Sequence, residues 1–255
     1  MRLSLFVFLF FFSISLFGQQ FSERKIKRML KKIPQFEKAH LALSVVTLNE
    51  AKPKASYQDQ HYMTPASNTK LLTFLSAVQQ FDSLPALYYR EQDSLLHFKA
   101  TGYPLLFHPF YPDTFLAAFF EQKKVWKYHP PLSKIKPQGP GWSWDDYAYY
   151  YAAERSPFPI FGNVVQAFGT PTSQQWVPQA FEKQLVLDSL GPNLKREKSK
   201  NQFRYNPEAW KAQDTLYRPF ITSDTLFVRL LEQQIRQPVK IEEQPLELHW
   251  EVLYT

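Results

Sequence analysis

The sequence contains no cysteine, and this absence removes several classes of protein at once. Disulfide bonds, thiolate metal sites, a cysteine nucleophile and an acylated lipoprotein cysteine all need the missing side chain. Glycine is also scarce, with 7 residues against 20 prolines, which favours stiff loops between short strands over flexible linkers. Stability must come from packing, and 255 residues with 44% hydrophobic composition suffice for one large domain or two modest ones.

Long hydrophobic runs are lacking after the N-terminus. The opening MRLSLFVFLFFFSISLFGQQ places one arginine before an apolar run from Leu3 to Phe17, followed by small and polar residues. The run is shorter than the ~20 residues that cross a bilayer, and its layout is typical of a secretory signal peptide, here residues 1–18. An uncleaved N-terminal anchor is the alternative. Either interpretation predicts export to the periplasm or cell envelope, and if the signal peptide is cleaved no integral membrane span remains.

The net charge of +7 suggests nucleic acid as a partner. Export argues against it, and so does the lack of any motif that would place a helix in a groove of DNA or stack bases on aromatic side chains. Much of the charge lies in two runs, ERKIKRMLKK and KREKSK. In the first run Ile26, Met29, Leu30 and Ile33 recur at helical spacing, which predicts an amphipathic helix with a solvated basic face. An anionic membrane or wall polymer is the alternative reading of that face.

The stretch TPASNTKLLTFLSAV, residues 64–78, carries a serine and a lysine near the start of an otherwise apolar helix. Pro65 suits a first helical turn, and Ser67 and Lys70 share one helical face because they lie three residues apart. Apolar residues follow on nearly every side of the helix, which predicts that it is buried within a domain. A strand is expected just before it, in HLALSVVTLNE, and DTLFVRLLEQQI near the C-terminus predicts an amphipathic helix.

Ser67 and Lys70 can form a nucleophile and its base. A lysine can take the proton of a serine only if the lysine pKa is lowered, which burial and the positive end of a helix dipole both promote. The same helix start can offer backbone N–H groups to an oxyanion. Ser22–Lys25 and Ser133–Lys136 share the spacing, but they lie on a charged helix and in a proline-rich loop. From these residues alone, a capping serine with a snorkelling lysine is the alternative.

Other polar residues give no support to metal or triad chemistry. Asp145 and Asp146 are adjacent, and neighbouring side chains diverge on a strand, so this pair is interpreted as structural. The 6 histidines are scattered singly, and none has ligand spacing to the aspartates or supports a Ser-His-Asp triad. No cofactor and no metal are therefore implied.

Longer segments resemble a known family. LALSVVTLNE…YMTPASNTKLLTFLSAV resembles the nucleophile region of penicillin-binding proteins. GPGWSWDDYAYYYAAERSPFPIFGNVV is similar to a segment of the class C members, the D-alanyl-D-alanine carboxypeptidases/endopeptidases. Two further segments, SLLHFKATGYPLL and NQFRYNPEAW, also resemble sequences of this family. The resemblance implies that Ser67 is the acylated nucleophile and Lys70 its proton-shuttling partner. It also implies peptidoglycan stem peptides ending in D-Ala-D-Ala as substrates and β-lactams as covalent inhibitors.

The resemblance implies an α+β protein: a partial transpeptidase/β-lactamase-like α/β domain, interrupted by a β-rich insertion after the nucleophile helix. Residues 19–80 would form the N-terminal part of that domain, with the Ser-x-x-Lys helix, and residues 81–255 the β-rich inserted region. A domain that is only partly encoded leaves apolar sheet and helix surface uncovered. Poor solubility of the isolated 255-residue form is therefore expected.

The sequence also departs from the family. The family completes its site with Ser-x-Asn and Lys-Thr-Gly, but no glycine here follows Lys-Thr, Lys-Ser or His-Thr. Ser199–Asn201 matches Ser-x-Asn only by chance in a charged loop, and Tyr103 replaces an aspartate in TGYP. Two hypotheses follow: an exported serine carboxypeptidase/endopeptidase represented here by a fragment, or a catalytically inactive truncated homologue serving as a wall-binding or scaffold protein. A serine β-lactamase is a third, which the GWSWDD segment disfavours.

Overall fold

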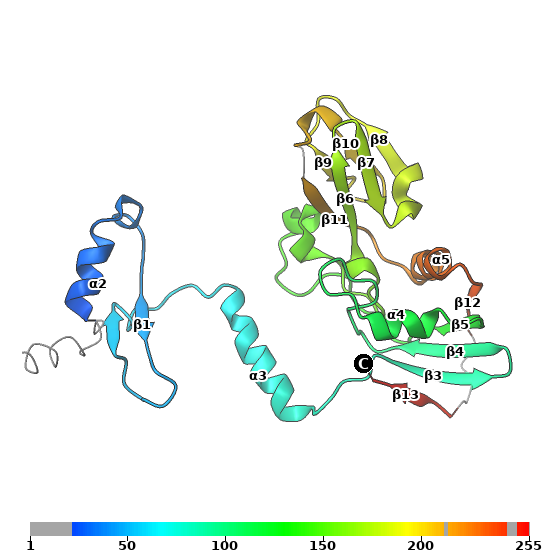
Figure 1. The fold of residues 1–255 in the computed structure, drawn as a ribbon, viewed down its shortest axis with the longest axis horizontal. Helices are drawn as coiled ribbons and strands as arrows, with labels where there is room; N and C mark the ends of the chain where they lie inside the picture. Colours follow the sequence, from blue (N-terminus) through cyan, green and yellow to red (C-terminus); the bar gives the residue numbers. More distant parts are fainter. Residues whose placement is uncertain (1–21, 212–213, 244–248, 255) are drawn as a thin grey trace, which may run out of the picture. The chain divides into compact units, whose positions relative to one another are not determined.

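The computed structural model describes residues 22–211, 214–243 and 249–254 (Figure 1). The expected signal peptide at residues 1–18 lies outside these residues. The chain divides into two compact units, residues 1–80 and 81–255, and each is considered by itself. The assignment of the second unit as an insertion into a transpeptidase-like domain stays a prediction.

The described part of the first unit, residues 22–80, contains two helices, two short strands and two 3-10 turns. In chain order these are α2 (Glu23–Leu30), η1 (Pro34–Phe36), β1 (Leu43–Val45), β2 (Ala55–Tyr57), η2 (Ser67–Thr69) and α3 (Lys70–Gln80). The strands pair antiparallel, with Ser44 opposite Ser56. The predicted amphipathic helix and the strand before the Ser-x-x-Lys stretch are both confirmed, as α2 and β1.

Among residues 22–80 of the first unit, very few side chains are buried. Ser22 caps α2 by accepting a hydrogen bond from the backbone N–H of Lys25 at 3.3 Å, and Ile26 on the apolar face of α2 is buried. Ile26 and Ala55 of β2 are the only buried residues among those described in this unit. Its helices and strands are therefore held mainly by local hydrogen bonds and by the contact of α2 with β2.

The second unit is rich in strands. Its five-stranded sheet has the order β12-β5-β4-β3-β13, and two three-stranded sheets have the orders β11-β6-β7 and β8-β10-β9. The strands are β3 (Leu87–Gln92), β4 (Leu95–Ala100), β5 (Val125–His129), β6 (Val164–Thr170), β7 (Ser173–Val177), β8 (Leu185–Leu187), β9 (Leu194–Arg196), β10 (Phe203–Tyr205), β11 (Thr215–Pro219), β12 (Val239–Ile241) and β13 (Glu251–Leu253). The helices are α4 (Thr114–Phe120) and α5 (Asp224–Ile235), and the 3-10 turns are η3 (Trp144–Ala148), η4 (Tyr150–Ala152), η5 (Phe161–Asn163), η6 (Gln179–Gln184) and η7 (Pro207–Ala209).

An aromatic core fills one face of the five-stranded sheet. β3 and β4 form a hairpin whose turn includes Asp93 at φ 53, a left-handed conformation that aspartate tolerates. Phe98 of β4 contacts Phe120 of α4 and Phe227 of α5, with ring centroids 5.3 and 6.4 Å apart. Both helices therefore cover the same face of this sheet, as Figure 1 shows. Alternation along the strand places His97 on the opposite face.

The C-terminal amphipathic helix is confirmed as α5. Ser223 caps it by accepting from the backbone N–H of Leu226 at 3.1 Å, and Leu226, Leu230 and Leu231 are buried as their spacing predicts. None of the described helices combines the length and hydropathy that crossing a membrane requires.

A left-handed turn precedes β6. Phe161, Gly162 and Asn163 have φ values of 54, 61 and 54. Asn163 is buried, its Nδ2 donates to Glu154 O and Ser156 Oγ at 2.9 Å each, and its Oδ1 accepts from Ile160 N at 3.2 Å. The turn is thus held by side-chain hydrogen bonds that offset the strain of left-handed residues other than glycine.

Candidate active site

Ser67 and Lys70 meet at the start of α3. Ser67 opens the 3-10 turn η2, and Lys70 is the first residue of α3. The backbone N–H of Lys70 donates to the carbonyl of Ser67, which closes one tight turn. That turn places Lys70 Nζ 3.0 Å from Ser67 Oγ, within hydrogen-bonding distance. The sequence-predicted pair is therefore brought together.

Short polar side chains fix the backbone around this pair. Asn68 Oδ1 accepts from the backbone N–H of Ala66 at 3.0 Å, and the hydroxyl of Thr69 donates to Ala66 O at 3.0 Å. Asparagine and threonine next to a helix start commonly make such local bonds. Pro65 lies before the turn, so it directs the entry of the chain and does not belong to the helix itself.

The expectation that α3 is buried is wrong for the described chain. All residues of α3 except Ala77 are exposed, and the exposed apolar ones are Leu71, Leu72, Phe74, Leu75 and Val78. The helix forms from local spacing, whereas its burial requires packing partners, which the first unit does not place against it. Lys70 at the start of α3 is likewise exposed.

The exposure of Lys70 limits what this arrangement can do. A protonated amine donates to the serine oxygen and holds it in place, but it cannot accept the serine proton. Desolvation is the main physical means of favouring the neutral amine, and it requires further groups packed around the lysine. The described geometry therefore supplies the positioned pair, and activation of the serine depends on a covering structure.

Asp145 and Asp146 lie on the 3-10 helix η3, which corrects the expectation of a strand. Tyr151 donates to Asp146 at 3.3 Å, and the Lys198 ammonium lies 3.6 Å from the ring centroid of Trp144. The two carboxylates thus belong to an exposed aromatic surface. Within the described parts of the chain, no group of three or more histidine, cysteine, aspartate or glutamate side chains could hold a metal ion.

Two residues singled out in the sequence, Asn201 and Tyr103, make hydrogen bonds within the second unit. Asn201, from the chance Ser-x-Asn match, exchanges hydrogen bonds with the backbone of Ile221, donating to its O at 2.8 Å and accepting from its N at 2.6 Å. Tyr103, which replaces the family's aspartate, donates its hydroxyl to Asp113. Both residues tie loops of the second unit together.

A cavity of about 370 Å³ in the second unit was not anticipated from the sequence. Its lining comes from three separate segments, 131–137, 155–163 and 220–227, together with Tyr128. The only sequence feature that could have pointed to this cavity is the proline-rich character of segment 131–137. The other lining residues are typical of a protein core or of the start of a helix.

Comparisons with known proteins agree with the resemblance. The model of the D-Ala-D-Ala carboxypeptidase 3 (S13) family matches residues 22–84, which include Ser67 and Lys70. The solved structure of penicillin-binding protein 4 from Haemophilus influenzae is similar in fold, with a TM-score of 0.56 and 18% sequence identity. No curated protein matches the sequence significantly.

The structural match covers 90% of this chain and 58% of that protein. The chain thus spans 58% of the length of this relative. The α+β fold of this chain is similar to that part of a penicillin-binding protein, and the resemblance to class C members is confirmed.

Proposed function

We propose that this chain belongs to a serine-type D-Ala-D-Ala carboxypeptidase/endopeptidase that acts on peptidoglycan stem peptides through an acyl-enzyme on Ser67. The observation that carries the proposal is the hydrogen bond of 3.0 Å between Lys70 Nζ and Ser67 Oγ, inside the segment that matches the S13 family. Of the other two Ser-x-x-Lys strings, the first places Ser22 at the cap of α2, where its Oγ accepts from the backbone N–H of Lys25, and the second lies in the 131–137 loop.

The proposed reaction has two steps. Ser67 Oγ attacks the carbonyl carbon of the penultimate D-alanine while its proton passes to neutral Lys70, and the peptide bond breaks as the terminal residue leaves with that proton. Water then attacks the acyl-enzyme ester, releasing the shortened peptide and restoring the serine hydroxyl. Backbone N–H groups at the start of α3 are candidates to stabilise the oxyanion in both steps.

The same proposal includes location and partners. A signal peptide at residues 1–18 would send the protein to the periplasm or cell envelope, where stem peptides are found. β-Lactams would acylate Ser67 because their strained amide resembles the scissile bond. Because the chain spans only part of its relative, activity and substrates are proposed for the whole protein, with these 255 residues as its N-terminal part.

Fluorescent penicillin tests the nucleophile directly. The native protein, purified from its own cells, is expected to gain one covalent label, and peptide mass spectrometry is expected to place it on Ser67. Ser67→Ala should abolish labelling and Lys70→Gln should slow it by about 100-fold or more. Ser133→Ala removes the serine of another Ser-x-x-Lys string and is the matched control. A label that persists in Ser67→Ala would contradict the proposal.

A catalytically inactive wall-binding or scaffold protein is the second candidate. The exposure of α3 favours it. Loss of one oxyanion donor typically costs ~10²–10³ in rate. Residues 19–255 alone are therefore expected to show negligible turnover. Rapid stoichiometric acylation of residues 19–255, abolished by Ser67→Ala, would overturn that expectation.

Two measurements separate the candidates. The intact mass of the mature native protein, compared with that of residues 19–255, shows whether further chain accompanies the Ser67–Lys70 pair. Release of D-alanine from a stem-peptide mimic, compared with hydrolysis of a chromogenic cephalosporin, distinguishes a carboxypeptidase from a β-lactamase. No mass excess together with no acylation would leave the scaffold function.

A further inference from the structure

The cavity of the second unit has an apolar floor. It lies between the loop 131–137, the segment 155–163 and the start of α5. Phe158, Ile160, Phe220 and Phe227 form the floor, and each is at most 6% exposed. Its volume of about 370 Å³ is in the range of small-molecule sites, which are mostly apolar with a few placed polar groups.

Side-chain hydrogen bonds hold the walls of this cavity in place. The guanidinium of Arg155 donates to the backbone carbonyls of Lys136 and Gln138 at 2.9 and 3.2 Å, which fixes the loop. Glu154 accepts from the backbone N–H and the hydroxyl of Thr222 at 2.7 and 2.9 Å, which fixes the chain entering α5. The cavity is therefore preformed, and a ligand would not bear the cost of ordering its walls.

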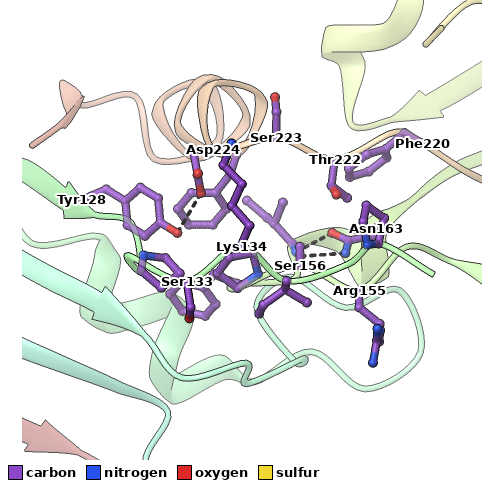
Figure 2. Close-up of a pocket in the computed structure, with 17 residues that line it drawn as sticks. Tyr128, Ser133, Lys134, Arg155, Ser156, Asn163, Phe220, Thr222, Ser223 and Asp224 are labelled. Atoms are coloured by element: carbon purple, nitrogen blue, oxygen red, sulfur yellow. Dashed lines mark hydrogen bonds between the residues drawn. The ribbon is translucent and has the colours of Figure 1, made fainter. Parts of the chain in front are cut away.

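Opposite charges border the cavity without ionic partners. Tyr128 donates its hydroxyl to Asp224 Oδ1 at 3.0 Å, and Figure 2 shows these two side chains pointing toward each other on one side of the cavity. Burial, and then the charge of Asp224, raise the pKa of Tyr128, so its hydroxyl keeps its proton. Among the described residues, neither half-buried Asp224 nor exposed Lys134 forms an ion pair.

Aromatic rings surround the carboxylate side of the cavity. The rings of Tyr128 and Phe227 are 4.9 Å apart, and Phe227 stacks on Phe158 at 5.3 Å. The Asp224 carboxylate, which accepts from the hydroxyl of Tyr128, attracts an ammonium group by charge. Asp224 also stabilises the first turn of α5, but that role needs neither a cavity nor a lysine at its rim.

We propose that this cavity binds a free amino acid with an apolar side chain, whose ammonium contacts Asp224, whose carboxylate faces Lys134 and whose side chain rests on the phenylalanine floor. Each part of the ligand then has a counterpart on the protein. This site goes beyond the proposed acylation at Ser67 and does not depend on it.

Three probes test the assignment by calorimetric titration of the full chain. Phenylalanine, as either enantiomer, presents all three parts, phenethylamine lacks the carboxylate, and 3-phenylpropionate lacks the ammonium. Phenylalanine is expected to bind at about millimolar Kd or tighter, which is ordinary for a ligand of this size. Phenethylamine should bind within about threefold of it, and 3-phenylpropionate at least about tenfold more weakly.

Two variants locate the contacts. Asp224→Asn keeps the size of the side chain and should weaken phenylalanine and phenethylamine by about tenfold or more. Lys134→Gln should weaken phenylalanine by about threefold and leave phenethylamine unchanged, since the amine has no carboxylate. Glu232→Gln removes the same charge from an exposed position of α5 outside the cavity and should change neither.

The Lys134→Gln comparison keeps the test valid if Asp224→Asn destabilises α5. Lys134 is exposed, so its substitution should not disturb folding, and thermal unfolding of each variant checks this. The proposal is overturned if phenylalanine shows no saturable binding up to about 10 mM, far above the Kd expected for its size. It is equally overturned if 3-phenylpropionate binds as well as phenylalanine, or if a folded Asp224→Asn variant binds unchanged.

Discussion

The helices α3 and α5 are similar in sequence and opposite in environment. Both carry leucine and phenylalanine at close spacing, and both end in a glutamine pair or near one. In α5, Leu230 is 1% exposed, whereas Leu72 in α3 is 68% exposed. Apolar spacing therefore specifies a helix locally, while the surrounding elements decide whether its apolar side is covered.

Leucine truncation should separate the two helices most strongly. Leu231→Ala in α5 removes a fully buried side chain and should lower the unfolding free energy by about 2–5 kcal/mol. Leu72→Ala in α3 should change it by less than about 0.5 kcal/mol, because no cavity forms and alanine favours the helix. Denaturant unfolding of both variants measures the contrast. Equal losses would show that α3 is packed in solution.

A pair of asparagines extends the comparison to polar contacts. Asn163 in the second unit is buried with three side-chain hydrogen bonds, so Asn163→Ala should cost about 2–3 kcal/mol. Asn68 in the first unit is exposed with a bond to Ala66, so Asn68→Ala should cost at most about 1 kcal/mol. Urea midpoints of the two variants test the ordering. A larger loss for Asn68→Ala would contradict it.

The second unit also contains a buried histidine pair that should make its stability depend on pH. His97 Nδ1 and His129 Nε2 are 2.9 Å apart, and Trp250 packs edge-on against His129. Burial, followed by the charge of His97, lowers the pKa of His129 from 6.5 to about 4, while Glu242 opposes the shift. Burial, followed by Lys127, also lowers the pKa of His97.

Because the folded pKa of His129 is depressed, the unfolded chain takes up the proton first. The contribution of neutral His129 to the folding stability is therefore fully present above about pH 6.5 and is lost as the pH falls toward about 4. We expect a loss on the order of 1–2 kcal/mol, reduced by solvent screening. Unfolding free energies at pH 7, 5.5 and 4 should show a shallower dependence in His129→Gln. His40→Gln in the first unit is the control for net charge, and identical slopes in all three proteins would refute the prediction.

Helix caps should give the smallest effects, and similar ones in the two units. Ser22→Ala removes the hydroxyl that accepts a hydrogen bond of 3.3 Å from a backbone N–H of α2, and Ser223→Ala removes the one that accepts a hydrogen bond of 3.1 Å from a backbone N–H of α5. Each should cost about 1 kcal/mol. Hydrogen exchange should rise in the first turn of α2 for one variant and of α5 for the other. Exchange that rises throughout the chain in either case would show that caps act globally here.

The sequence predicted the elements whose signals are local. Helical spacing located α2 and α5, β-branched residues located β1, and the Ser-x-x-Lys spacing anticipated the contact of Ser67 with Lys70, because neighbours along one turn need no distant partner. It misjudged the burial of α3 and placed Asp145 and Asp146 on a strand, although they lie on a 3-10 helix. The apolar residues of α3 do not reveal whether other elements cover that helix, and two adjacent aspartates do not reveal the secondary structure around them.

The sequence alone was enough to locate the helices α2, α3 and α5 and to reveal the family resemblance of the Ser67 segment. Three features depend on how the segments pack: which apolar faces are buried, how His97 meets His129, and how Lys134 and Asp224 come to line one cavity. The reason is physical. Helix formation and capping depend on residues within about four positions, whereas burial and cavities depend on contacts between segments that lie tens of residues apart.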